Sequence, residues 1–552
     1  MAEPTAQEIT HPTTPESTLD GATHPSGLVL YDTMRGQKLP LELLEAGRCS
    51  IYVCGPTVYD MSHVGHARAA IVPDILVRAL SELGIKVTYA RNITDIDDKI
   101  IRKAADEGCT HQAIATRYAD AYHDDLEALH CRLPDIEPKV TEHIGEILAM
   151  ISALIDRGLA YEASGDVYFR VANFADYGAL SGRTLEDMQA GARVEVNERK
   201  ENPLDFVLWK GAKPGEPSWP SPWGEGRPGW HIECSAMSQR YLGETFDVHV
   251  GGRDLIFPHH ENEIAQSQGA CGSGTFARRW LHNGFVDFAG EKMSKSLGNF
   301  FTIREVIELY PAEALRFFLL GVHYRSGINF DVEVSCPKCQ AKLSTEEQSA
   351  SACPHCDAAL DVAALRARVR FPGLEEADER LRAIYETLVK SQDFLEKSAA
   401  KGGAAPDAPV AASVDGMLSR FRAAIADDLN TAAAIAVLSE PLREVNRLLA
   451  AKKKDVNVAE RWATVARFVA DVGVVARYLG VLGSDPGVYL RARRDHKVAR
   501  LGLDTAKIDE LIAQRVRARV EKRWKEADAL RDELASMGVV VNDGAQQSSW
   551  TL

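Results

Sequence analysis

The sequence predicts a multidomain α/β protein that ends in an all-α part, and three observations support this. Its 552 residues are enough for three or four domains with cores of their own. Within about 28–330, short β-branched and aromatic runs alternate with helical patterns, which is typical of strand–helix–strand units. Over about 374–485, Leu, Val and Ala recur at helical spacing, which predicts a helical bundle.

The first unit predicts a strand at Ser50–Cys54, a loop, a helix at Ala67–Leu83 and a second strand at Lys86–Thr94. Asp95 can cap a further helix that ends near Glu107. Such a right-handed β-α-β crossover is half of a Rossmann-like fold, in which phosphates bind at the N-terminus of the helix. The glycine-rich fingerprint of that fold is absent.

The loop of this unit lies in the stretch Tyr52–His66, which reads Y-V-C-G-P-T-V-Y-D-M-S-H-V-G-H. His63 and His66 flank Gly65, so the backbone can come close to a ligand while two imidazoles donate hydrogen bonds to phosphate oxygens. For H-x-G-H alone, a histidine-rich turn beside a core strand is an equally good interpretation.

A mostly helical stretch at about 111–200 is interpreted as a subdomain inserted between two halves of the nucleotide fold. A strand at Phe246–Val250 follows, and Pro258 suits the first position of a helix. His259 and Glu263, four residues apart, would then project from the same face of that helix. A further strand and loop lead to the polar stretch E-K-M-S-K-S-L-G-N.

Lys292 and Lys295 lie in K-M-S-K-S, with Gly290 before it and Gly298 after it. Two ammonium groups on such a loop can close onto a triphosphate and neutralise the charge that develops as pyrophosphate leaves. For this motif alone, a solvated Lys/Ser turn is the alternative. A chance K-M-S-K-S downstream of a strand, a loop and a helix that carry H-V-G-H is improbable.

Cys54, Cys234, His259 and Glu263 offer two thiolates, an imidazole and a carboxylate, the ligand types that suit zinc. Each has an ordinary alternative: a buried core thiol for either cysteine, and a surface pair or local hydrogen bond for H-x-x-x-E. The order H-E-x-x-H is absent, so a metalloprotease is not supported.

In their surrounding strings, C-G-P-T-V-Y-D, G-W-H-I-E-C-S-A-M and F-P-H-H-E-N-E-I-A-Q-S, these residues resemble the cysteinyl-tRNA synthetases of the class I aminoacyl-tRNA synthetase family. The resemblance covers about Leu28–Phe330 and about Leu374 to the end. It implies ATP-dependent activation of L-cysteine to cysteinyl-adenylate and transfer to the 3′ end of tRNA(Cys), with AMP and pyrophosphate as products and Mg²⁺ accompanying ATP. A site that depends on a polar contact rejects an analogue lacking it by as much as roughly 10⁵, so we expect no editing domain.

The resemblance also implies the roles of individual residues. The two histidines and the two lysines would hold ATP and stabilise the transition state of activation. The zinc would bind the substrate as a thiolate, with Glu263 the ligand most easily displaced. Trp230 could equally be a core aromatic residue, and Asp254 a helix cap. The implied contacts are Thr57, Thr94 and Trp230 to cysteine, and Gly252 and Asp254 near the adenosine ribose of ATP or the substrate amine.

Four cysteines occur where the usual family pattern has none. They form C-P-K-C, thirteen intervening residues and C-P-H-C, which fits a closed tetrahedral four-thiolate zinc site. The stretch between the pairs is too polar to build a core, so metal would supply its folding energy. His355 as a competing ligand and a redox-active pair are the alternatives. The predicted ligands of this second, structural zinc are Cys336, Cys339, Cys353 and Cys356.

The basic stretch Leu490–Lys525 has twelve Lys or Arg against five Asp or Glu, so we expect it to contact tRNA. The net charge of -15 argues against indiscriminate nucleic-acid binding. The expected organisation is a disordered tail at 1–27, a catalytic domain at 28–330 with its inserted subdomain at about 111–200, a zinc-ribbon-like insertion at 331–373, a helical bundle at 374–485 and a tRNA anticodon-binding module at 486–552.

Composition indicates a cytoplasmic protein, and we favour a monomer. No apolar run approaches the roughly 20 residues needed to span a bilayer, and the N-terminal stretch lacks the apolar region of a signal peptide. Ten cysteines in so long a chain do not indicate a disulfide scaffold, and two C-x-x-C pairs point to a reducing compartment.

Two other functions fit parts of the sequence. The cysteine ligase of mycothiol biosynthesis shares the same activating unit but lacks the long anticodon-reading end, which Ala426–Leu449 and Ile508–Trp550 resemble here. A catalytically inactive RNA-binding or zinc-thiol-sensing protein is the other. Intact H-V-G-H and K-M-S-K-S argue against it, because such a protein has no use for pyrophosphate chemistry.

Overall fold

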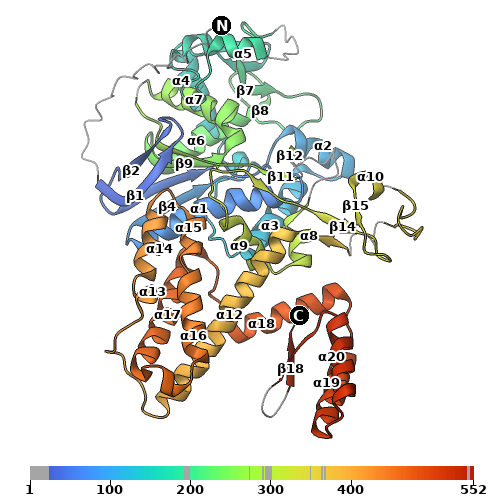
Figure 1. Ribbon diagram of the computed structural model, residues 1–552. Helices are drawn as coiled ribbons and strands as arrows, with labels where there is room; N and C mark the ends of the chain where they lie inside the picture. Colours follow the sequence, from blue (N-terminus) through green and yellow to red (C-terminus); the bar gives the residue numbers. More distant parts are fainter. Residues whose placement is uncertain are drawn as a thin grey trace, which may run out of the picture.

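The computed structural model places a parallel-sheet domain above a helical bundle, with the four-cysteine segment and a C-terminal helical module at one side (Figure 1). It describes residues 24–191, 199–272, 274–288, 291–292, 301–348, 350–361, 365, 368–543 and 548–551. Most of the expected tail at 1–27 lies outside these residues. Its expected end falls inside strand β1 (His24–Asp32), which forms an antiparallel hairpin with β2 (Gln37–Leu43).

Four parallel strands form the central sheet in the order β10-β9-β3-β4. Their apolar residues are buried on both faces, as a parallel sheet covered by helices requires. The chain passes from β3 to β4 on one side and later adds β9 on the other, so the strand order reverses between β3 and β9. Ligands of open α/β sheets bind beyond the carboxyl ends of the strands at such a point. The strands are β3 (Arg48–Val53), β4 (Lys86–Arg91), β9 (Phe246–Gly252) and β10 (Ala277–Asn283).

The predicted β-α-β crossover is confirmed, although its first helix begins earlier than expected. Helix α1 spans Val64–Glu82 rather than Ala67–Leu83. The Nδ1 atom of His63 accepts a hydrogen bond from the Gly65 N–H at 3.0 Å and caps the helix. The histidine loop is therefore part of the N-terminus of α1.

The expected cap of the next helix was wrong. Helix α2 (Asp98–Glu107) is capped by Asp97, whose Oδ1 accepts a hydrogen bond from the Lys99 N–H at 2.8 Å. Asp95 instead accepts a hydrogen bond from the Thr141 hydroxyl at 2.6 Å and fixes the start of the inserted chain.

The inserted part contains a second, antiparallel sheet in the order β5-β6-β7-β8, packed against helix α4 (Ile144–Asp156). Helix α3 (His111–Ala128) packs instead with α1 and α2 in the core of the parallel sheet. We therefore propose limits of about 140–228 for the insert in place of the expected 111–200. Its strands are β5 (Ala160–Ala163), β6 (Asp166–Phe169), β7 (Phe206–Gly211) and β8 (Gly226–Pro228), and α5 (Leu185–Gly191) lies between β6 and β7.

Pro258 does not start a helix as expected. It follows a cis peptide bond in a short turn at Ile256–His260, and helix α7 spans Glu261–Cys271. His259 and Glu263 nevertheless lie together, because the turn leads directly into α7. Helix α6 (Trp230–Leu242) packs alongside α7.

The rest of the chain contains the end of the sheet domain, the four-cysteine insertion, the predicted bundle and the C-terminal module. No helix in the described part of the chain is long and apolar enough to cross a membrane. The elements are β11 (Val286–Phe288), β12 (Glu291–Lys292), α8 (Ile303–Leu309), α9 (Ala312–Leu320), β13 (Ile328–Asn329), β14 (Glu333–Ser335), β15 (Lys342–Leu343), α10 (Thr345–Gln348), β16 (Val369–Arg370), α12 (Pro372–Ala399), α13 (Ala412–Asp415), α14 (Met417–Ala426), α15 (Thr431–Ala436), α16 (Ser439–Ala450), α17 (Val458–Leu479), α18 (Pro486–Leu501), α19 (Thr505–Val520), α20 (Trp524–Ser536), β17 (Val540–Asp543) and β18 (Ser548–Thr551).

A buried ion pair joins the sheet domain to the bundle. Arg316 of α9 is fully buried and donates from Nη2 to the carboxylate of Asp74 on α1. Its Nε donates to the carbonyl of Leu479, the last residue of α17, at 2.7 Å. Burial alone would raise the pKa of Asp74, but Arg316 and Arg78 outweigh burial and lower that pKa. Asp74 is thus held ionised where three helices meet.

We expect Asp74→Asn to lower the free energy of unfolding by about 3–5 kcal/mol at pH 7, because it leaves Arg316 buried without its counter-charge. A carboxylate with a lowered pKa in the folded state stabilises the protein above its ordinary pKa of about 3.9, and this stabilisation is lost as pH falls through the lowered value. Urea unfolding should therefore show the difference between wild type and variant shrinking below about pH 4.

The control is Asp393→Asn, which removes an exposed partner of Lys397 on α12. Its cost should stay below about 1 kcal/mol. Equal losses of stability from the two substitutions would contradict a special role for the buried pair.

Candidate active site at the carboxyl ends of β3 and β9

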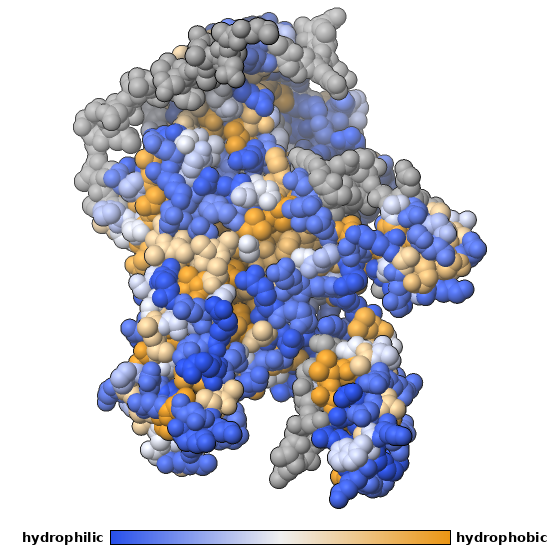
Figure 2. All heavy atoms as spheres, viewed as in Figure 1, coloured by the Kyte–Doolittle hydropathy of each residue, from blue (hydrophilic) through white to orange (hydrophobic). Residues whose placement is uncertain are grey.

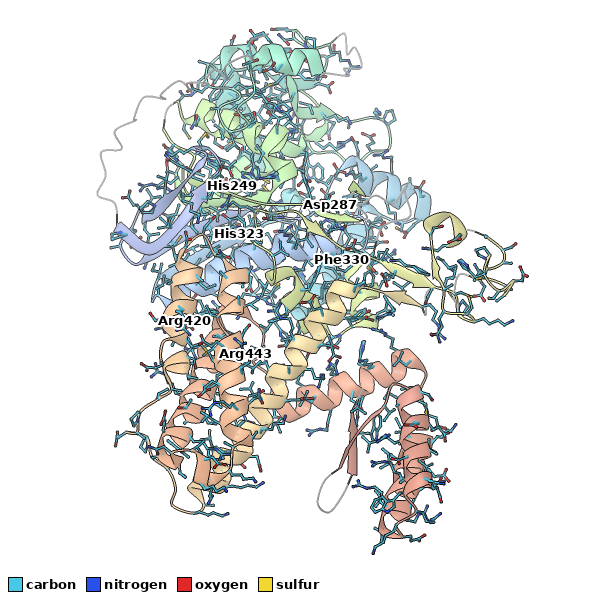
Figure 3. The ribbon with its side chains drawn as sticks, viewed as in Figure 1. His249, Asp287, His323, Phe330, Arg420 and Arg443 are labelled. Atoms are coloured by element: carbon cyan, nitrogen blue, oxygen red, sulfur yellow. The ribbon has the colours of Figure 1, made fainter. Side chains whose placement is uncertain are left out.

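A cavity of about 630 Å³ opens at the predicted point of the sheet, between the loop after β3, the N-terminus of α1 and the end of β9. Cys54, His63, His66 and Trp230 line it. Figure 3 shows His249 of β9 inside the sheet domain, with Asp287 of β11 nearer the four-cysteine segment. The structure therefore brings the histidine loop and the first thiol to a single cavity.

The two loop histidines are each held through their Nδ1 atoms. The Nδ1 atom of His63 accepts the Gly65 N–H, and the Nδ1 atom of His66 accepts the His63 N–H at 3.1 Å. Burial lowers the pKa of His66 to about 4, so this ring is neutral at pH 7. A neutral ring whose Nδ1 accepts a hydrogen bond carries its proton on Nε2. His66 can thus donate to an anion without bringing a charge of its own.

The structure places only one of the two predicted lysines. Lys292 ends strand β12, and its backbone lies opposite Asp287 in the antiparallel pairing with β11. Val286 of β11, next to Asp287, lines the cavity. Lys295 lies outside the described residues.

The predicted first metal set converges beside the cavity, which one of its members, Cys54, lines. One ligand atom from each of the four residues lies within 4.8 Å of the others. The Cys54 and Cys234 sulfurs are 3.7 Å apart, and Cys54 Sγ lies 3.2 Å from Glu263 Oε1. His259 Nε2 lies 3.0 Å from the same oxygen. The members are Cys54, Cys234, His259 and Glu263.

The orientation of His259 fits a metal. Its Nδ1 lies 2.9 Å from Nδ1 of His231, while its buried Nε2 faces the other members of the set and lies 3.0 Å from Glu263 Oε1. An imidazole held through one nitrogen, with the other aimed at two thiols and a carboxylate, is the usual arrangement of a zinc ligand. Without metal, burial would lower the pKa of His259, but Glu263 and Cys234 raise that pKa to about 10.

Sequence reasoning did not find the histidines behind this set. His249 Nε2 lies 2.9 Å from Glu263 Oε2, and His260 Nε2 lies 3.4 Å from Cys54 Sγ. His260 also contacts His282 at 2.8 Å, and His282 contacts the Thr33 hydroxyl at 2.8 Å. A second possible ligand set therefore shares Cys54 and Glu263 with the first and adds His249 and His260. Only the density of histidine over residues 249–282 signals this layer in the sequence.

Of the three residues predicted to contact the substrate cysteine, two line the cavity and one does not. Trp230 lines the cavity with 39% of its surface exposed and stacks on His259 at a ring separation of 4.2 Å. Thr57 also lines the cavity and pairs with Thr94 in a parallel bridge. Thr94 is buried, and its hydroxyl donates to Glu233 at 3.0 Å. Thr94 is thus engaged by Glu233 and is not one of the residues that line the cavity.

Gly252 and Asp254, predicted near the ribose or the amine, both line the cavity. Gly252 ends β9, and Asp254 follows it in a short 3-10 turn. His66 lines the same cavity, and the negative charge of Asp254 raises the pKa of His66 against the larger, opposite effect of burial.

The four cysteines of the insertion also converge. Cys336 Sγ lies 3.6 Å from Cys356 Sγ, and Cys339 Sγ lies 3.8 Å from Cys353 Sγ. The two knuckles have matching backbone turns: the Gln340 N–H donates to the Cys336 carbonyl, and the Asp357 N–H to the Cys353 carbonyl. All four sulfurs lie within 4.8 Å of one another. His355 is about half exposed and is not part of the set.

Comparisons with protein families match three parts of the chain. Residues 40–336 match the tRNA synthetases class I (C) catalytic domain. Residues 420–474 match the DALR domain, and residues 505–550 match the cysteinyl-tRNA ligase anticodon binding domain.

Relatives from bacteria align over nearly the whole chain. The cysteine–tRNA ligase of Anaeromyxobacter dehalogenans is 47% identical over 526 residues, which cover 94% of this chain and 98% of that protein. The one from Geobacter sulfurreducens is 46% identical over 523 residues, covering 95% and 99%. Among solved structures, Mycobacterium tuberculosis methionyl-tRNA synthetase in complex with methionyl-adenylate has a TM-score of 0.57 at 17% identity, covering 80% of this chain and 93% of that one. That likeness shows a shared fold.

Gly55 fixes the position of the adjacent Cys54, because there is no space for a side chain at residue 55. A Cβ atom at Gly55 would lie 1.6 Å from the Asn92 carbonyl oxygen of the neighbouring chain segment. Gly55→Ala should therefore push the Cys54 loop away from Asn92 and Cys234, lowering the free energy of unfolding by about 2 kcal/mol or more and weakening zinc retention against a chelator.

The matched control is Gly145→Ala in α4, where a Cβ atom meets nothing within 4 Å. It should leave stability equal or slightly higher. Zinc retention and stability of wild-type level in Gly55→Ala would show that the loop tolerates the added methyl group.

Proposed function

The chain belongs to the cysteinyl-tRNA synthetase family, and on that premise we propose how its residues divide the work of charging tRNA. As a member it uses ATP to activate L-cysteine and transfers the cysteinyl group to tRNA. In activation, a carboxylate oxygen of cysteine attacks the α-phosphorus of ATP, and the bond to pyrophosphate breaks. In transfer, a hydroxyl group of the terminal ribose of tRNA attacks the carbonyl carbon, and AMP leaves.

His63 and His66 would bind the phosphates of ATP. Both line the cavity and are held through Nδ1, and the N-terminus of α1 adds free N–H groups and a favourable dipole. Lys292 and Lys295 would neutralise the charge on the departing pyrophosphate. The role of Lys295 depends on its motif alone, and Mg²⁺ with ATP stays a prediction.

Cysteine would bind beside Trp230 in the cavity. A zinc ion held by Cys54, Cys234, His259 and Glu263 would supply a bond to the substrate thiolate that the hydroxyl group of serine cannot match. The observation that carries this proposal is the convergence of the four ligand atoms within 4.8 Å, next to the cavity that Cys54 and Trp230 line.

The other predicted contacts divide into two groups. Thr57, Gly252 and Asp254 line the cavity and would contact the bound cysteine or ATP. Thr94 would act indirectly, because its backbone pairs with Thr57 while its hydroxyl is bonded to Glu233.

tRNA would be bound mainly by the C-terminal module at 486–552 and its basic stretch Leu490–Lys525. The anticodon binding domain matched at 505–550 supports this assignment. The mycothiol ligase alternative has no need of such a module. A monomeric state and a cytoplasmic location stay predictions.

Cys234→Ser tests the zinc proposal. It should remove one zinc per chain and raise KM for cysteine by at least about 10²-fold, while KM for ATP changes little, because only the cysteine end of the cavity loses a ligand. Metal analysis and cysteine-dependent exchange of pyrophosphate into ATP measure these effects.

The control is Cys271→Ser at the end of α7, whose sulfur accepts a hydrogen bond from Gln239 and belongs to none of the possible metal sets. It should keep its zinc and its activity. If metal-free Cys234→Ser still preferred cysteine to serine by a large factor, steric fit would be the better explanation.

We also propose that the four-cysteine set holds a second, structural zinc. The reduced wild-type protein should contain two zinc ions per chain. Cys336→Ala combined with Cys353→Ala should lose one of them and keep cysteine-dependent pyrophosphate exchange, because four thiolates leave no position for substrate. A count of one zinc in the intact protein would contradict this proposal.

A further inference from the structure

A second cavity, of about 320 Å³, lies where four parts of the chain meet. Its walls are the loop between α8 and α9, the base of the four-cysteine insertion at Ser335 and Arg368–Arg370, the first turns of α12, and α18. Figure 1 shows α18 below the insertion and beside α12. We call this space the junction cavity, because it borders the sheet domain, the insertion and the C-terminal module.

The junction cavity has a surplus of positive charge. Five permanent cations face three carboxylates and one histidine, which leaves an excess of two positive charges with the histidine neutral. Such a surplus of positive charge favours the binding of an anion. The charged lining residues are Arg368, Arg370, Arg493, Lys497, Arg500, Glu375, Asp378, Glu379 and His496.

One of the three carboxylates, that of Glu375, already forms ion pairs with two cations from different parts of the chain. Glu375 of α12 accepts Arg370 Nε at 2.9 Å from the insertion and Arg500 Nη2 at 3.2 Å from α18. It also accepts the Tyr310 hydroxyl at 3.1 Å. Glu375 therefore fastens the insertion and α18 together and cannot neutralise a third cation.

Glu379 is shared even more widely. It accepts hydrogen bonds from Arg493 Nη2 at 2.6 Å and from Arg382 Nε at 2.7 Å. Lys497 Nζ forms a longer ion pair with it, at 3.5 Å. Burial and then the charge of Arg493 lower the pKa of Lys497. Asp378 is fully engaged by Arg493 through 2.8 and 2.9 Å bonds from Nε. Lys497 is thus the least compensated cation on the α18 side.

Arg368 is the corresponding cation on the side of the insertion. It is exposed at the cavity wall, and within the described residues its guanidinium group makes no hydrogen bond or ion pair. Arg368 of the insertion and Lys497 of α18 therefore both offer donors to a ligand in the cavity. Figure 2 shows the surface notched between the lobe that contains the insertion and the C-terminal module below it, so this side is open to a large partner.

We propose that the junction cavity binds a phosphate group of the tRNA backbone, held between Arg368 and Lys497. This inference rests on the proposed binding of tRNA by the module at 486–552. A tRNA that is being aminoacylated must reach both that module and the active site of the sheet domain, and the junction cavity lies where these two parts meet. Phosphate is the anion that every tRNA presents, and guanidinium and ammonium groups are its usual ligands. The four-cysteine insertion would then contribute to the aminoacylation of tRNA, because it supplies Arg368 to this site.

The test uses Arg368→Ala, Arg368→Glu and Lys497→Ala in the full-length, zinc-replete protein. The Kd for tRNA should rise about threefold to tenfold for each alanine variant at moderate salt, and further for Arg368→Glu. The slope of log Kd against log salt should fall by about one for each phosphate group that the variant no longer binds. Cysteine-dependent pyrophosphate exchange should stay at the wild-type level in all three, which also shows that they fold.

The matched control is Lys342→Ala, which removes an exposed lysine of the same insertion that pairs with Glu333 and does not line the cavity. It should change neither Kd nor the salt slope. Unchanged Kd and slope in the alanine variants would overturn the proposal and leave the cavity a structural ion network.

Titration with inorganic phosphate, without tRNA, distinguishes the source of the anion. Weak phosphate binding in the wild type that is abolished in Arg368→Ala and Lys497→Ala, together with their weaker tRNA affinity, supports a backbone phosphate. Phosphate binding abolished in the variants while tRNA affinity is kept would show a site for a free anion and would also overturn the proposal.

Discussion

The site is organised by the need to compensate one buried carboxylate. Glu263 is fully buried, and burial alone would raise its pKa, yet His249 and His259 keep that pKa well below its ordinary value. An isolated ionised carboxylate in such a place costs many kcal/mol, so each neighbouring group has to offset its charge. A divalent cation among the two thiols and His259 would do so more completely than protons do. The three chain segments that supply these ligands are fixed relative to one another by the same requirement.

The features that could be predicted from the sequence are those that depend on neighbouring residues in the chain or on a recognisable motif. The strands β3, β4 and β9, the helix after β3 and the convergence of Cys54 with Cys234 all followed from apolar spacing, motif context and ligand type. Pro258 was placed at a helix start because prolines favour that position, but packing of the turn at Ile256–His260 overrode the preference. The cap of α2 was missed because Asp95 and Asp97 are equally suitable by type, and only the tertiary contact of Asp95 with Thr141 separates them.

The histidine layer could not be predicted for a different reason. His249, His260 and His282 lie on a strand, a turn and another strand, and each is ordinary in its own segment. Their relation appears only when β9, β10 and the start of α7 are packed together. Thr94 shows the converse case. The family resemblance implied that it contacts cysteine, but its hydroxyl is bonded to a buried partner, Glu233, that no sequence pattern indicated.

The insertion has ends that meet. Phe330, just before it, and Phe371, just after it, pack with ring centroids 4.7 Å apart. Because the chain leaves and re-enters the framework at nearly the same point, the segment between them can be added or removed without moving β13 or α12. The four-cysteine insertion is therefore a side branch of the chain, attached to the framework at a single point.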